Sequence, residues 1–571
     1  MMPRMPLRRM RPSVLALASA AALLVACSDP AELPVPPAPY APPPSSAVVE
    51  EGSVRIRRDV FLVPGVTPPP NPVTGSATPA EYNAVRVVRY RVDADPPAPA
   101  RAVAVLMPGF LGGANSYDPM ARAIVRRSKE GEAFEAWAID RRSNLLEDHH
   151  GLDVAEFRKD PEIAKRYYFE EEPAEGKTFP GFLDQTAVDY ASEWGLDTTI
   201  GDLRRVVDIV APEERKARVF LVGHSLGATI AEEYAAWDFD GKPGYGELAG
   251  LVLVDGVARQ EGAAAPTITE EDYLKGSSQN VDAYLTPGLE TIRKTTRYIA
   301  LPLLGLKVYP VAAIAGMRAL WSPTAITEDP YRDSAFLTLL SLTDVPRMTN
   351  RAAMGFAMDD ASNGVSFAAV SCGASKGGAL AEYDSLFGTK LVQPSDPTAT
   401  YDWVEYDATN PREHTSLEDI SRSWFEGPSL DFGEWYFPAR LSLDAQAAAT
   451  LVLKDTDWPR ANHGLRAIHG ASMDLPIFAA VAGLVGDTAA LDPLRALVQN
   501  VPIGPGRPLA GKPRTESDAF VVLDIVDLTH IDPLAGTDDG QGDVTKWYDS
   551  LTTWMTTNSP AGGVVLAPSA P

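Results

Sequence analysis

The residues with the clearest chemical potential form one short motif, Gly223-His224-Ser225-Leu226-Gly227. A serine hydroxyl is a weak nucleophile until a neighbouring base accepts its proton, after which it attacks carbonyl carbons. Glycine on both sides permits a turn so tight that a side chain at either flanking position would collide with the backbone. The G-x-S-x-G spacing therefore predicts a serine held on a strained turn, with acyl transfer as its chemistry.

The sequence around the motif supplies the elements that this serine requires. Val219–Val222 is a short apolar run typical of a buried strand, and Ala228–Trp237 is expected to be a helix. The serine would then lie at a helix N-terminus, where free amides and the positive end of the dipole favour developing negative charge. The amide of Leu226 is the expected first donor of an oxyanion hole. A glycine-flanked serine that only caps a helix is the alternative.

Further apolar runs predict the sheet that carries the motif. Alternating apolar residues in Ser53–Leu62 and Ala84–Val92 indicate two leading antiparallel strands. Between later strands, Asp197–Val210 has the apolar stripe of an amphipathic helix. Short continuous apolar runs, expected for parallel strands buried on both faces, are Ala102–Met107, Ala136–Ile139, Val219–Val222, Gly250–Val254, Pro476–Ala482 and Ala519–Val526. We therefore expect an α/β fold with a doubly wound, mostly parallel sheet.

This arrangement, with the segment VAVLMPGFLGG from Val103 to Gly113, resembles the α/β-hydrolase superfamily and its serine esterases and lipases. The resemblance covers about residues 110–255 and 470–560. In that family a glycine-rich loop after the third strand supplies a second oxyanion amide. Here Pro108 replaces the usual histidine, and the resemblance implies Phe110, or less favourably Leu111, as the donor. A simple Pro-Gly turn is the alternative.

The resemblance also implies a base and an acid. Family order places the base after the last strand, where Val521–Leu534 contains His530, and an expected closing helix follows at Val544–Thr556. For the acid, family placement favours Asp487 after the penultimate strand, and Asp255 at the end of the preceding strand is the alternative. Asp527, close to His530 in sequence, is expected to be solvated. The implied reaction is ester hydrolysis through an acyl-enzyme.

A long interruption separates the sixth strand from the seventh. The stretch between Val254 and Pro476 far exceeds an ordinary connection, so a mainly helical lid subdomain is expected at 258–472. By analogy with lids of this family, apolar or lipid esters are the favoured substrates. A peptidase or amidase and a non-catalytic surface-binding lipoprotein are the alternatives, whereas Ser225 argues against epoxide and haloalkane hydrolases. The lid aromatics either line a pocket or form the lid's own core: Trp321, Trp424, Trp435, Tyr436 and Phe437.

The N-terminus predicts export and lipid attachment. Arginines precede an apolar run too short to span a membrane comfortably, and Leu24-Val25-Ala26-Cys27 resembles the bacterial lipobox. We expect a signal peptide at 1–26, a diacylated Cys27 and a proline-rich tether at 27–50. Ser28 favours the outer membrane, on its periplasmic or surface face. The hydrolase core is expected at 51–257 and 473–560 and a flexible tail at 561–571, with Cys372 as the one ordinary thiol.

Charge and motif spacing exclude several other classes. The chain has 51 Lys and Arg against 76 Asp and Glu, and a net charge of −25 repels nucleic acid phosphates. Gly506–Pro513 lacks the hydroxyl residue of a phosphate-binding loop, and His463 and His469 are not spaced to bind zinc from one helical face. No metal or organic cofactor is implied. The expected partners are a small-molecule or lipid ester and the membrane, with the oligomeric state left open.

Overall fold

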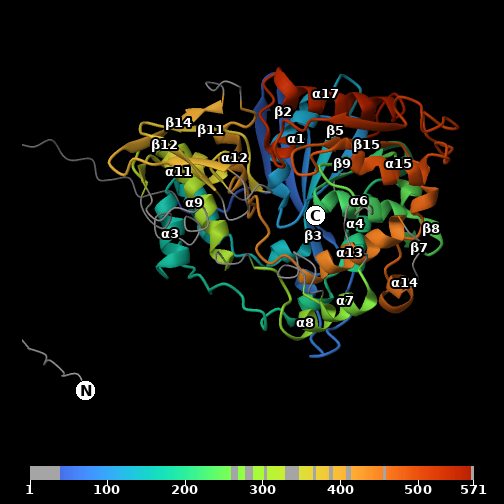
Figure 1. Ribbon diagram of the computed structural model, residues 1–571, viewed down its shortest axis with the longest axis horizontal. Helices are drawn as coiled ribbons and strands as arrows, with labels where there is room; N and C mark the ends of the chain where they lie inside the picture. Colours follow the sequence, from blue (N-terminus) through green and yellow to red (C-terminus); the bar gives the residue numbers. More distant parts are fainter. Residues whose placement is uncertain are drawn as a thin grey trace, which may run out of the picture. The chain divides into compact units, whose positions relative to one another are not determined.

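A nine-stranded sheet lies at the centre of the unit that spans residues 41–571 (Figure 1). Its strand order is β1-β2-β3-β5-β4-β6-β9-β15-β16. Neighbouring strands pair in antiparallel fashion along the part β1-β2-β3-β5. They pair in parallel along the part β5-β4-β6-β9-β15-β16. Their bounds are β1 Ser46–Glu51, β2 Val54–Pro64, β3 Ala84–Val92, β4 Ala100–Met107, β5 Ala133–Asp140, β6 Val219–His224, β9 Gly250–Val254, β15 Ile477–Val481 and β16 Phe520–Asp524.

The computed structural model describes residues 39–258, 268–276, 287–300, 305–327, 346–363, 368–384, 390–406, 413–453 and 458–566. Every strand expected from the apolar runs is present, because those runs are buried: β4, β5, β6, β9 and β15 are buried along their whole length. The additional strand β1 begins inside the segment expected to be a tether and pairs with β2.

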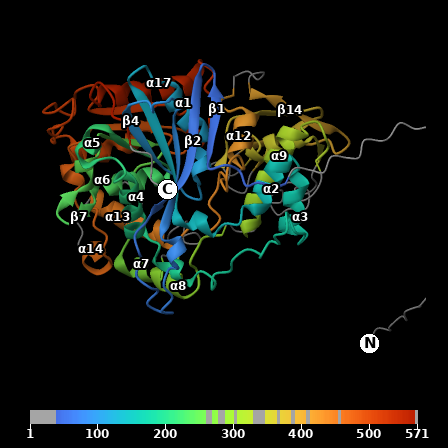
Figure 2. The ribbon, with the colours of Figure 1, turned by 180° about the vertical axis from the view of Figure 1, so that it is seen from behind.

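Helices cover both faces of the sheet, which confirms the doubly wound α/β fold (Figures 1 and 2). One face packs against α1 (Asp118–Arg126) and α17 (Gly542–Thr557). The other packs against α4 (Leu196–Val207), α6 (Leu226–Ala236), α13 (Ala439–Leu453) and α15 (Asp492–Val498). Two short helices lie in the connections between these elements: α5 (Pro212–Arg218) precedes β6, and α16 (Asp532–Ala535) lies between β16 and α17. Each face therefore has its own apolar core.

The insertion between β9 and β15 combines helices with two small sheets. A three-stranded sheet has the order β10-β14-β11, and β12 and β13 form a hairpin. The bounds are α7 Glu270–Lys275, α8 Leu289–Lys294, α9 Val308–Trp321, β10 Arg347–Met348, α11 Asn350–Met358, β11 Gly373–Lys376, β12 Leu380–Asp384, β13 Lys390–Pro394, β14 Thr400–Glu405, α12 Leu417–Ser423 and α14 Trp458–His463. Its last long helix, α13, packs on α4 and α6 and so belongs to the layer that covers the sheet.

A second part of this cap comes from the segment after β5. Helices α2 (His150–Arg158) and α3 (Pro161–Phe169) pack against α9 of the insertion (Figures 1 and 2). Trp435 lies at their junction, fully buried among Tyr168, Phe182 and Tyr309. This aromatic side chain therefore packs the cap internally, which was one of the two roles expected for the lid aromatics.

Several expectations concern other parts of the chain. Cys27 and the expected signal peptide lie outside the described residues, as does the end of the tail from 567. Cys372 is buried, and burial raises the pKa of its thiol, as expected for a packed and unreactive cysteine. Among the helices that the structure describes, none has both the length and the apolar character of a membrane span.

Candidate active site

Ser225 occupies a strained position between β6 and α6. Its φ of 55° and ψ of −126° are rarely adopted by residues with a side chain. A Cβ atom on Gly223 would lie 2.0 Å from the carbonyl oxygen of Gly227, and one on Gly227 would lie 2.1 Å from that of Met107. Both glycines are therefore required by backbone contact, as the G-x-S-x-G spacing predicts.

His530 and Asp255 form a buried pair beside this turn. His530 Nδ1 lies 2.6 Å from Asp255 Oδ2, and their side chains are 3% and 0% exposed. The same carboxylate accepts the amides of Ala482, Leu484 and Val485 at 2.9, 3.0 and 3.0 Å. Burial raises the pKa of Asp255, but the hydrogen bond and charge of His530 outweigh burial and hold that pKa below its ordinary value. The carboxylate is thus ionised and fixed in orientation.

Backbone contacts bring this pair against the serine turn. The Ser225 amide donates to the carbonyl of Val254 at 2.9 Å, one residue before the acid. A Cβ on Gly256 would lie 2.3 Å from the Ser225 carbonyl oxygen, so only glycine permits this approach. Asp255 itself has a φ of 43°. The end of β9 therefore packs directly on the turn that carries Ser225.

His224 connects the serine turn to the histidine loop. Its Nε2 lies 2.8 Å from the carbonyl oxygen of His530, and the two ring centroids are 4.3 Å apart. Burial and the neighbouring His530 lower the pKa of His224, so this imidazole is neutral and donates its Nε2 proton to that carbonyl. The residue that precedes Ser225 thus holds the backbone of His530 in place.

The structure corrects the preference for Asp487 as the partner of His530. Asp487 is exposed, and its side chain accepts the amide of Ala489 at 2.8 Å, as the N-cap of a short helix at Thr488–Leu491. The position beside His530 belongs to Asp255, the alternative. The physical reason lies in the turn after β15. Its amides bind the carboxylate of Asp255, which His530 also contacts, whereas the carboxylate of Asp487 binds the amide of Ala489.

The residues expected to form the oxyanion hole flank Ser225. Leu226 is the first residue of α6. A Cβ on Gly109, in the loop after β4, would lie 2.8 Å from the Cβ of Ser225, and Phe110 follows directly. The Phe110 ring contacts Phe437 edge to face, with the centroids 4.8 Å apart. The glycine-rich loop therefore lies against Ser225. This loop contains Phe110, the residue that the resemblance implies as the second oxyanion donor.

Arg141 holds this loop and was only weakly signalled by the sequence. One of its guanidinium nitrogens, NH2, donates to the carbonyls of Pro108 and Gly109 at 2.5 and 2.6 Å. Its other terminal nitrogen, NH1, lies 2.5 Å from Glu434 of the insertion, and both side chains are buried. Its neighbours are also paired, because Asp140 forms an ion pair with Arg86 and Arg142 forms one with Asp202. The partner of Arg141 lies far along the chain, which no local pattern reveals.

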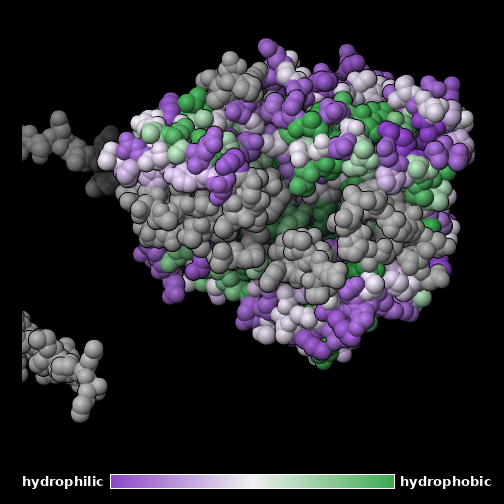
Figure 3. Space-filling view, in the orientation of Figure 1, coloured by the Kyte–Doolittle hydropathy of each residue, from purple (hydrophilic) through white to green (hydrophobic). Residues whose placement is uncertain are grey.

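Two hollows lie outside this buried pair. The face seen in Figure 1 has a recess in which hydrophobic side chains are visible (Figure 3). A separate cavity of about 550 Å³ lies between the insertion and the last core loops, and its lining includes Glu413, His414 and Asp527. Asp527 is exposed, as expected.

Comparisons with known proteins agree with the fold. A family model described as "Alpha/beta hydrolase family" matches residues 104–359. This match spans less than half of the chain and agrees with the resemblance of the strand order and serine turn to the α/β-hydrolase superfamily. No curated protein sequence matches the chain.

Three solved structures are similar to the chain at low identity. A putative lipase from Sulfolobus solfataricus is 13% identical with a TM-score of 0.41, over 89% of this chain and 99% of that one. An esterase from Thermogutta terrifontis is 11% identical with a TM-score of 0.33, over 87% and 99%. An epoxide hydrolase from Vigna radiata is 11% identical with a TM-score of 0.35, over 87% and 98%. Such distant similarity does not distinguish among reactions.

Proposed function

We propose that the protein is a serine hydrolase that cleaves carboxylic esters, with Ser225 as nucleophile, His530 as base and Asp255 as acid. The observation that carries the proposal is the buried His530–Asp255 pair, 2.6 Å apart, on the loop next to the strained serine turn. A fixed acid, a histidine and a strained serine are the parts that acyl transfer needs.

The reaction proceeds in two halves. Ser225 Oγ attacks the ester carbonyl while His530 accepts its proton, and the amides of Phe110 and Leu226 stabilise the oxyanion. The Nδ1 atom of His530 is engaged by Asp255, which supports Nε2 as the atom that accepts the proton. His530 then protonates the leaving alcohol, and a water activated by the same histidine releases the acid. Asp255 stabilises the imidazolium that forms in both halves.

Apolar acyl groups are the proposed substrate class. Phe110 follows Gly109 in the loop that lies against Ser225, and its ring contacts Phe437, so these two side chains offer a surface that suits an acyl chain. A charged or strongly polar acyl group would lose its hydration at such a surface without gaining a partner.

A substrate panel tests the proposal. Purified protein is assayed with p-nitrophenyl esters of increasing acyl length and with a matched set of peptide and anilide substrates. We expect ester turnover that rises with acyl length in the wild type and is lost in Ser225→Ala. Amide turnover above ester turnover would indicate a peptidase. Failure of both panels in well-folded protein would indicate a binding protein.

We also propose that Cys27 is diacylated and anchors the protein to the outer membrane. The support is the lipobox-like sequence that ends at Cys27, followed by the proline-rich segment. Expression in a bacterial host with labelled palmitate tests this: the wild type should carry label and partition into detergent, and Cys27→Ser should do neither. Label retained in Cys27→Ser would contradict the anchor.

A further inference from the structure

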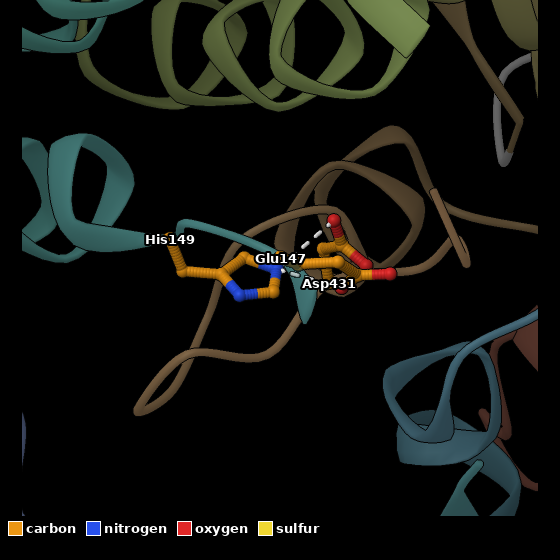
Figure 4. A group of neighbouring side chains, drawn as sticks. All are labelled: Glu147, His149 and Asp431. Atoms are coloured by element: carbon orange, nitrogen blue, oxygen red, sulfur yellow. Dashed lines mark ion pairs between the residues drawn. The ribbon is translucent and has the colours of Figure 1, made fainter. Parts of the chain in front are cut away.

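A second cluster of ionisable side chains lies at the junction of core and insertion. Glu147 follows the short helix at Arg142–Leu146, His149 is the N-cap of α2, and Asp431 comes from the insertion. Their side chains are 0%, 2% and 1% exposed. Figure 4 shows the imidazole facing both carboxylates. The mechanism proposed above uses none of these residues.

The spacing of the three groups suits a small cation. His149 Nε2 lies 3.3 Å from Glu147 Oε2 and 3.3 Å from Asp431 Oδ2, and the potential ligand atoms all lie within 4.8 Å of one another. Zinc binds nitrogen and oxygen at about 2.0–2.2 Å, so two ligands of a tetrahedral site lie roughly 3.3–3.5 Å apart. The two separations from His149 Nε2 match that edge length.

Several buried polar atoms of this cluster have no hydrogen bond. Neither ring nitrogen of His149 has a hydrogen-bond partner, and neither does Glu147 Oε2, although all are buried. Buried polar atoms without partners are rare in folded proteins and call for a ligand or water. This buried imidazole, which faces two carboxyl groups and forms no hydrogen bond, distinguishes the cluster from an ordinary acidic group.

The carboxylates are also oriented by their neighbours. Trp435 donates its backbone amide to Glu147 Oε1 at 2.7 Å and its indole Nε1 to Asp431 Oδ2 at 2.6 Å. The amide of Gly433 donates to Asp431 Oδ1 at 3.1 Å. Metal sites commonly use such outer hydrogen bonds to fix ligating carboxylates. The bond to Oε1 leaves Glu147 Oε2 directed at the imidazole.

The local charge balance favours a cation. The nearby arginines are committed elsewhere, because Arg86 pairs with Asp140 and Arg141 pairs with Glu434. The two buried carboxyl groups therefore face the imidazole of His149, and neither of these two arginines is paired with them.

We propose that Glu147, His149 and Asp431 bind one divalent cation of the zinc class, which links the insertion to the core. The imidazole nitrogen decides the class, since calcium and magnesium take oxygen ligands whereas zinc binds nitrogen and carboxylate oxygen together. Three protein ligands leave the remaining position to water. This inference revises the expectation of no metal, which rested on histidine spacing. The ligands here are one histidine, a glutamate two residues earlier and a distant aspartate.

Metal titration of the purified, tag-free mature protein tests the proposal. The protein is stripped with chelator, dialysed and titrated with ZnCl₂ by calorimetry, and Co²⁺ is added in parallel to record visible absorption. We expect one site per chain and a Co²⁺ spectrum typical of low coordination number. Because loss of an outer-shell partner alone costs roughly 10–100-fold in affinity, Asp431→Asn should weaken binding by at least about 100-fold.

Matched variants separate this site from other histidines and from the hydrolase chemistry. His150→Gln alters the adjacent histidine, whose Nε2 lies 2.8 Å from the Ala174 carbonyl oxygen, and should bind Zn²⁺ as the wild type does. Ser225→Ala should also bind normally, so the result stands whether or not the proposed ester hydrolysis is correct. Zinc should raise the Tm of the wild type and of His150→Gln, but not that of Asp431→Asn.

Three results would overturn the proposal. They are a wild type that takes up no stoichiometric Zn²⁺, an Asp431→Asn variant that binds as tightly as the wild type, and a metal spectrum without nitrogen ligation. If Asp431→Asn does not fold, X-ray absorption of the Zn²⁺-loaded wild type decides, since one imidazole nitrogen with oxygen ligands is required. In the absence of metal binding, the cluster would be a buried polar contact between one imidazole and two carboxyl groups.

Discussion

Replacing Asp255 by asparagine should separate the two candidate acids. The Asp255 carboxylate accepts the amides of Ala482 and Val485 on Oδ1, and the Leu484 amide and His530 Nδ1 on Oδ2. Asparagine keeps one acceptor and gains one donor. If its NH₂ group faces His530, the imidazole is forced into the wrong tautomer. If the NH₂ group instead faces the amides of Ala482 and Val485, these two buried amides lose their acceptor.

The size of the effect follows from these contacts. A wrong tautomer in a serine triad lowers kcat by about 10⁴-fold, which corresponds to roughly 5 kcal/mol at 1.36 kcal/mol per factor of ten. Two unsatisfied buried donors would instead cost about 1–3 kcal/mol each in the free energy of unfolding. In either orientation, Asp255→Asn also lacks the negative charge that stabilises the imidazolium. We therefore expect kcat to fall by about 10⁴-fold.

The assay compares Asp255→Asn with Asp487→Asn on one p-nitrophenyl ester, with circular dichroism and Tm as folding controls. Asp487 is an exposed N-cap, and asparagine caps a helix as well as aspartate does, so this variant should keep wild-type kcat and nearly wild-type Tm. A folded Asp255→Asn with more than about a tenth of wild-type kcat would refute the reasoning. Equal losses in the two variants would refute it as well.

Three further predictions concern the residues around this site. Gly109→Ala would place a Cβ 2.8 Å from the Cβ of Ser225 and should lower kcat by at least about tenfold, whereas Gly246→Ala, with open space around it, should not. Arg141→Lys cannot bond both loop carbonyls, so kcat should fall roughly 10–100-fold with little change in KM; an unchanged kcat would remove Arg141 from the account. Burial raises the pKa of Glu232 to about 7, so its protonation favours the folded state, and stability is lost as pH rises from about 4.5 towards 7. Glu232→Gln should therefore be more stable than the wild type by up to about 3 kcal/mol at pH 8, and the gain should vanish below about pH 4.5 in denaturant titrations.

Local patterns predicted the sheet and the serine turn because each is determined by neighbouring residues. A buried parallel strand needs a continuous apolar run, and the tight turn at Ser225 needs glycine at 223 and 227, where a Cβ would meet backbone about 2 Å away. These requirements are visible in a few adjacent letters. The strand before each candidate residue followed from them.

The acid could not be chosen in the same way. Asp255 and Asp487 both end apolar runs before His530, and chain order does not separate them. The choice depends on the turn after β15, whose amides at 482, 484 and 485 bind the Asp255 carboxylate. The direction of those amides is a property of the folded turn, and no residue type in that stretch signals it.

The contacts between the core and the insertion could not be predicted from the sequence either. Arg141 reaches Glu434, and Glu147 and His149 reach Asp431, across about 280–290 residues of sequence. Pairings at such separations arise only when the cap packs on the core. Sequence patterns with a fixed short spacing therefore miss both the residue that holds the glycine-rich loop and the proposed cation site.

Reaction with a fluorophosphonate is the most direct test of the central claim, that Ser225 is a nucleophile activated by the His530–Asp255 pair. Purified wild-type protein is treated with the probe, its intact mass is measured, and the modified peptide is sequenced. We predict one adduct per chain, located on Ser225, absent in Ser225→Ala and formed far more slowly in Asp255→Asn. An adduct on another residue, or none on folded wild-type protein, would contradict the account.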